Sequence, residues 1–121
     1  MAQVVRVMHS IFLKISLVIS MGPAGILKKV LGNVRQYAKY PNRVRKYKVD
    51  SIDLAAGVSD YPNDIRYSLF SIDGCHTALH TCNDLIFAER VTSTGGVVII
   101  DDINNISRMG VFEGVCKYLH G

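Results

Sequence analysis

The chain has 121 residues, 49% of them hydrophobic, which fits one folded domain and excludes a globally disordered protein. Its formal net charge of +4 hides an asymmetry. Residues 1–49 hold ten Lys or Arg and no acid, whereas residues 50–121 hold four Lys or Arg and ten acids. This asymmetry is typical of a basic arm that binds nucleic acid or a membrane, or of a solvated basic helix face behind a targeting-like leader. We favour the second interpretation and expect no nucleic-acid partner.

Residues 1–22 are basic and apolar, but their apolar stretch is too short to span a bilayer and is interrupted by Lys14, so we expect no transmembrane segment. The segment can be a targeting peptide or a strand or helix of the domain. We treat residues 1–22 as a segment that can lie outside the fold and residues 23–121 as the domain. The odd number of cysteines, three, favours reduced thiols in an intracellular protein. We therefore expect a cytoplasmic location, with targeting to an organelle left open.

The first half of the domain shows one clear helical pattern. Gly, Pro, Ala and Gly at 22–25 break the chain, and apolar residues then recur at helical spacing over 26–38. The residue before Pro41 disfavours a helix, so the helix should end there. Alternating residues over 44–49 predict a strand, and residues 53–66 read as a loop with one helical turn.

The second half alternates strands and helices. The pattern predicts a strand over 67–72, a helix over 78–89, a turn at 94–96, a strand over 97–100, a polar loop over 103–108 and a helix over 109–119. Such alternation predicts an α/β fold with a parallel sheet and right-handed crossovers.

Acidic residues follow two of the predicted strands. Asp73 ends the strand over 67–72, and Asp101 and Asp102 end the strand over 97–100. His76 lies three residues after Asp73, across a glycine turn. The carboxyl ends of neighbouring parallel strands meet at one edge of a sheet, where three carboxylates and an imidazole suit a hard divalent cation and a general base. Taken alone, Asp73 reads equally well as a cap for the next turn.

These residues belong to a longer pattern. The motifs are Asp73-Gly74-Cys75-His76, Asn83-Asp84-Leu85, and Gly95-Gly96-Val97 followed by Asp101-Asp102. Together they resemble the C-terminal half of class I S-adenosylmethionine-dependent methyltransferases, most closely the metal-dependent O-methyltransferase branch. Residues 44–51 are similar to the third strand of that family.

The resemblance implies a Rossmann-like, doubly wound, mostly parallel sheet and methyl transfer from S-adenosylmethionine to a hydroxyl of a small molecule. It assigns Asp73, Asp101 and Asp102 to Mg²⁺ or a similar divalent cation, and His76 to the role of base. It places Asp50, Ser51 and Asp73 at the cofactor.

The chain departs from the family at both ends. It has no match to the Gly-rich turn after the family's first strand or to the family's last strands. The chain therefore resembles a truncated, partial fold, and we expect it to bind S-adenosylmethionine poorly, which leaves open whether it is active as it stands. The alternatives are a non-enzymatic remnant or interaction module with a basic N-terminal arm, and a metal-dependent hydrolase or phosphotransfer domain with an unrelated sheet. An exposed sheet edge would favour an oligomer.

Overall fold

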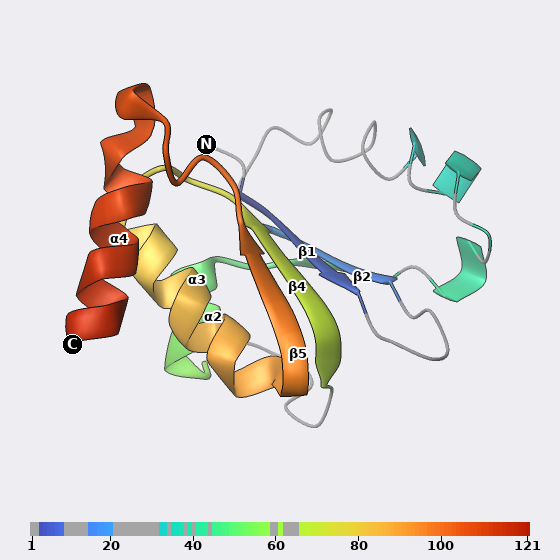
Figure 1. Ribbon diagram of the computed structural model, residues 1–121. Helices are drawn as coiled ribbons and strands as arrows, with labels where there is room; N and C mark the ends of the chain where they lie inside the picture. The colour runs from blue at the N-terminus through green and yellow to red at the C-terminus, as the bar shows by residue number, and fades with distance from the viewer. Residues whose placement is uncertain are drawn as a thin grey trace.

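The computed structural model describes residues 3–8, 15–20, 32–33, 35–37, 39, 41–43, 45–58, 61 and 66–121 (Figure 1). Its strands are β1 (Gln3–Met8), β2 (Ile15–Ser20), β3 (Arg45–Lys48), β4 (Tyr67–Asp73) and β5 (Thr92–Ile100). Its helices are α2 (Ser51–Ala56), α3 (Ala78–Val91) and α4 (Met109–His120), with 3-10 turns η1 (Pro41–Arg43) and η2 (Ile106–Arg108). No helix among these residues is long and apolar enough to cross a membrane.

The strands form one sheet in the order β3-β2-β1-β4-β5. β2 and β3 are parallel, as are β4 and β5, whereas β1 runs antiparallel to both of its neighbours. It follows that β2, β3, β4 and β5 all point the same way and β1 alone is reversed. The prediction that the strands near 44–49, 67–72 and 97–100 point the same way in one sheet is confirmed. The predicted mostly parallel sheet is instead a mixed sheet, because two of its four strand pairs are antiparallel.

The N-terminal segment, residues 1–22, supplies two strands at the centre of this sheet. β1 and β2 pair from Gln3 opposite Ser20 to Met8 opposite Ile15. Only residues 9–14 join them, which is enough for a hairpin but too short for the crossover that parallel neighbours need. The short connection therefore accounts for the reversed direction of β1.

The predicted helix over 26–38 lies largely outside the described residues. Its described members, residues 32–33 and 35–37, are helical. Of the predicted loop over 53–66, residues 59–60 and 62–65 are likewise outside the description.

α2 begins at Ser51 and overlaps the start of the loop predicted over 53–66. Asp50 caps the helix, because its Oδ1 accepts a hydrogen bond of 2.8 Å from the backbone N–H of Ile52. Gly57 ends it in the left-handed conformation at φ 74°, where it donates its N–H to the carbonyls of Asp53 and Leu54. A complete short helix therefore stands directly at the carboxyl end of β3.

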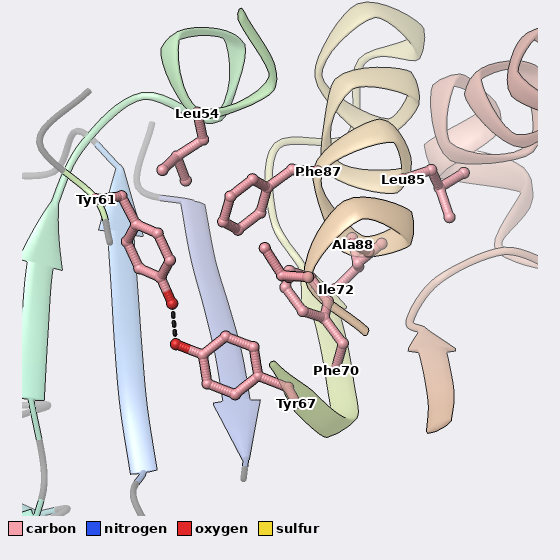
Figure 2. Close-up of a cluster of buried hydrophobic side chains, with 9 residues drawn as sticks. Leu54, Tyr61, Tyr67, Phe70, Ile72, Leu85, Phe87 and Ala88 are labelled. Carbon is pink, nitrogen blue, oxygen red and sulfur yellow. Dashed lines mark hydrogen bonds between the residues drawn. The ribbon is translucent and has the colours of Figure 1, made fainter. Parts of the chain in front are cut away.

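The core lies between the sheet and the helices α2 and α3, which with α4 gather on one side of the sheet (Figure 1). Aromatic rings meet edge to face at its centre: Phe87 of α3 lies 5.3 Å from Tyr61 and 5.9 Å from Phe70, centroid to centroid (Figure 2). The Tyr61 and Tyr67 hydroxyls hydrogen-bond to each other, which satisfies both polar groups inside this apolar cluster.

The turn predicted at 94–96 is wrong, because β5 already begins at Thr92. Its register against β4 shifts between Tyr67 and Leu69, and the extra residues form a bulge. Gly95 has φ 78° there, and a Cβ on Gly96 would lie 2.5 Å from Cγ2 of Thr92. The glycines therefore serve a bulge inside one strand rather than a turn before it.

α4 packs closely on α3, as two of its glycines allow. A Cβ on Gly114 would lie 2.6 Å from Cβ of Thr81, and one on Gly110 would lie 2.1 Å from the His76 carbonyl oxygen. The predicted helices over 78–89 and 109–119 are confirmed as α3 and α4. Their close contact brings the start of α4 against the loop that carries His76.

Candidate functional site

The carboxyl ends of β4 and β5 meet, as the sequence predicted. Ile72 pairs with Ile100, and the backbone N–H of Asp101 donates to the Ile72 carbonyl at 2.9 Å. Asp73 and Asp101 therefore leave neighbouring strands at the same edge of the sheet. Both side chains are exposed, whereas Asp102 and His76 are half-buried.

His76 and Asp102 form the central contact of this edge. His76 Nε2 lies 2.8 Å from Asp102 Oδ2. Asp102 reaches this position with φ 58°, a left-handed conformation that aspartate tolerates better than most residues. The pairing joins the loop after β4 to the loop after β5.

Asn105 holds Asp102 from the other side. Its Nδ2 donates to Asp102 Oδ1 at 3.1 Å, while its own Oδ1 caps η2 by accepting from the backbone N–H of Ser107 at 3.1 Å. The hydrogen bond from Asn105 is the largest cause that holds the pKa of Asp102 below its ordinary value, with smaller contributions from His76 and Arg108. Asp102 is therefore an ionised, acceptor-only group at neutral pH.

Arg108 completes the cluster from the residue before α4. Its Nη1 contacts His76 Nδ1 and lies 3.1 Å from His76 Nε2, and its Nε lies 3.8 Å from Asp102 Oδ2. Because Asp102 can only accept, Nε2 of neutral His76 carries the proton and donates it. Nδ1 then presents a lone pair, and in this structure the Arg108 guanidinium covers it.

The arrangement does not support the predicted divalent-cation site at Asp73, Asp101 and Asp102. Among the described residues, no three His, Cys, Asp or Glu side chains are placed to hold a metal ion. Both Asp102 oxygens are engaged by neighbouring side chains, and Asp101 Oδ1 accepts from the Asp102 backbone N–H at 2.9 Å. These residues as placed do not fit a metal ion.

The predicted cofactor residues Asp50 and Ser51 lie after β3, at the same edge of the sheet but beyond β2 and β1 in the strand order. Asp50 caps α2, and Ser51 is 1% exposed, which leaves its hydroxyl inaccessible to a ligand. β1 is antiparallel and places Val4 opposite Asp73, so the start of β1, and not its end, lies at this edge. Two strands therefore separate Asp50 and Ser51 from Asp73 along the sheet, and their predicted role at the cofactor stays a prediction.

Sequence reasoning missed three residues that the structure singles out. The sequence predicts a polar loop around Asn105 and Arg108. Asparagine is a common helix-capping residue, and this was the one sequence signal that could have pointed to Asn105. Asp84 belongs to the Asn83-Asp84-Leu85 motif, yet it is 1% exposed on the inner side of α3. Neither Asp84 carboxylate oxygen has a hydrogen-bond partner among the described residues.

One of the comparisons with known proteins identifies a family for the chain. No curated protein and no solved structure gives a significant match to the chain. The family described as "Methyltransferase domain" matches residues 5–103, from β1 through β5 to the start of the loop that carries Asn105. This match spans well over half of the sequence, and the chain belongs to the methyltransferase domain family.

Proposed function

We propose that the chain carries the acceptor side of a methyltransferase site, with His76 as general base toward the hydroxyl of a small molecule. The observation that carries this proposal is the 2.8 Å contact between His76 Nε2 and an Asp102 kept ionised by its neighbours. A carboxylate that holds one ring nitrogen leaves the other free in principle to accept a proton, and it stabilises the imidazolium that forms.

The proton step uses Nδ1 of His76. A hydroxyl oxygen becomes a good nucleophile only as its proton leaves, and Nδ1 is the acceptor that the tautomer provides. Arg108 covers that atom, so an acceptor must displace the guanidinium before His76 can act. Arg108 is 44% exposed and free to turn toward solvent or toward an acceptor.

The methyl donor that family membership implies in general is S-adenosylmethionine. The antiparallel β1 and the buried Ser51 support the expectation that this chain binds it poorly on its own. The divalent cation that the resemblance implied has no support in the geometry of the described residues. The expected activity is therefore slow and detectable only when the donor is in large excess.

The test is a single-turnover assay with labelled S-adenosylmethionine at millimolar concentration and a panel of small alcohols and phenols. We expect slow label transfer that falls about a hundredfold or more in His76→Gln, the scale of a lost general base. The matched control is His120→Gln, because His120 is exposed at the end of α4. Transfer that is equal in both variants would remove His76 from the mechanism.

A second candidate is the non-enzymatic remnant or interaction module. It is favoured by the reversed direction of β1 and by the ten basic residues of 1–49. Complete absence of methyl transfer from the folded wild-type protein, together with no heat of binding for S-adenosylmethionine, would select this candidate over the enzyme.

A further inference from the structure

β5 is the last strand in the order of the described sheet, with β4 on its one occupied side. The Asp101 N–H points to β4, where it donates to Ile72, and backbone groups alternate in direction along a strand. Val98 and Ile100 therefore direct their own N–H and C=O groups to the open edge. Such a row of backbone groups is a template for another strand.

The two edges of the sheet differ in how they resist pairing. β3, at the opposite edge, reads Arg-Lys-Tyr-Lys, and clustered like charges of this kind discourage pairing with a copy of the same strand. β5 reads Thr-Ser-Thr-Gly-Gly-Val-Val-Ile-Ile and has neither a charge nor a proline. Beyond its bulge, the β5 edge therefore lacks the charged side chains that protect the β3 edge.

An exposed apolar surface adjoins the β5 edge. Val98 and Ile100 pack against the core on the α3 side. Val97 and Ile99 therefore lie on the opposite face, where their side chains are 55% and 49% exposed. Val97 stands in register with Leu69 of β4, so the apolar surface continues inward across the sheet.

We propose that β5 pairs antiparallel with β5 of a second copy, about a two-fold axis at Val98. This register joins the outward backbone groups of Val98 to those of the partner subunit's Val98. It also sets Val97 opposite Ile99 of the partner subunit, and Ile99 opposite the partner's Val97. The exposed β-branched side chains thereby become cross-strand neighbours on one face, the contact that stabilises sheets.

The same register explains why the pairing stops at two copies. Asp101 falls opposite Gly95 of the partner subunit, at the bulge, where the ladder ends. The two Asp101 residues then lie about 20 Å apart along the strands, so they do not repel each other strongly. Because the pairing is isologous, it uses up both β5 edges and leaves only the basic β3 edges outside.

The test is sedimentation equilibrium on the full chain between about 1 and 100 µM, the range in which a micromolar dimer dissociates. We expect a species of twice 13.4 kDa for the wild type. Ile99→Lys places a charge twice in the interface and should raise the dimer Kd by about thirtyfold or more. The control is Ile106→Lys, because Ile106 is 87% exposed in η2, away from the strand, and should leave Kd unchanged.

A second measurement keeps the test independent of how well the variant folds. In wild-type protein, hydrogen exchange at the Val98 and Ile100 amides should slow as concentration rises, whereas the Ile99 amide, which faces β4, should not change. A wild type that stays at 13.4 kDa throughout would overturn the proposal. An assembly that Ile106→Lys weakens more than Ile99→Lys would also overturn it, because the interface would then lie elsewhere.

Discussion

Asp84 should contribute more to the stability of the fold in acid than at neutral pH, and replacing it with Asn should remove this pH dependence. Its side chain is 1% exposed, and neither of its oxygens has a hydrogen-bond partner in ordinary geometry among the described residues. Burial is the main cause that raises its pKa from 3.8 to about 6; the nearby Ser51 hydroxyl opposes the rise and Asp50 adds to it. The folded chain therefore binds the Asp84 proton more tightly than the unfolded chain.

The direction and size of the pH effect on stability follow from this difference in proton binding. The contribution of Asp84 to stability is complete below pH 3.8, declines as the pH rises through about 6, and is lost above that. A difference of about 2 pKa units corresponds to about 3 kcal/mol of unfolding free energy. At pH 7.5, Asp84→Asn should therefore be more stable than wild type by about 1–3 kcal/mol, since the buried amide keeps some cost of its own.

The assay is urea unfolding of wild type and Asp84→Asn at several pH values from 4 to 8. The difference between the two proteins should be small at pH 4 and grow through pH 6, which separates Asp84 from the other carboxylates. Asp53→Asn is the matched control, because Asp53 is exposed on the adjacent α2 and should change stability by a few tenths of a kcal/mol at every pH. If the unfolding free energies of wild type and Asp84→Asn changed with pH in the same way, the reasoning would be refuted.

Three further predictions concern the site and the core. Asp102→Asn removes the acceptor that fixes His76, so nitrogen–proton correlation spectra should show both imidazole tautomers; a single unchanged tautomer would contradict the assignment. Gly114→Ala forces a Cβ to within 2.6 Å of Thr81 and should lower the unfolding free energy by about 1–3 kcal/mol in urea; an unchanged midpoint would show that α4 moves away at no cost. Burial and its neighbouring hydroxyl raise the pKa of Tyr61, so ultraviolet titration should detect its ionisation only together with alkaline unfolding, and earlier ionisation would count against the buried pair.

The predictions from sequence succeeded where one pattern had one structural meaning. The apolar spacing of α3 and α4 and the β-branched runs of β4 and β5 each fit a single element, and the alternation of those elements required parallel strands. Asp73, Asp101 and Asp102 could be placed at one edge for the same reason. The same placement brings His76 close to all three acids, although the sequence does not indicate that Asp102 is the one it contacts.

Other features depended on contacts that a linear pattern does not contain. The glycines at 95 and 96 are equally suitable for a turn and for a bulge, and only the register against β4 distinguishes the two. Asp50 ends a strand and also caps a helix, so α2 was read as loop. Arg108 reaches His76 because Gly110 lets α4 approach that loop, and a side chain directed by distant packing leaves no local signal.

The direction of β1 decides what the candidate site can be built from. If β1 ran parallel to β4, the residues after it would stand beside Asp73 and could close around a ligand there. Because β1 is reversed, its first residues lie at that edge. The carboxyl ends of β2, β3, β4 and β5 lie at the same edge, and the residues directly after β2 lie outside the described part of the chain. β3 is followed by a capping Asp50 and a buried Ser51, so the accessible chemistry of the described residues rests on the loops after β4 and β5. An acid–base pair and an exposed arginine on those two loops suit an acceptor hydroxyl better than a large cofactor, which is why the proposed function is confined to the acceptor side.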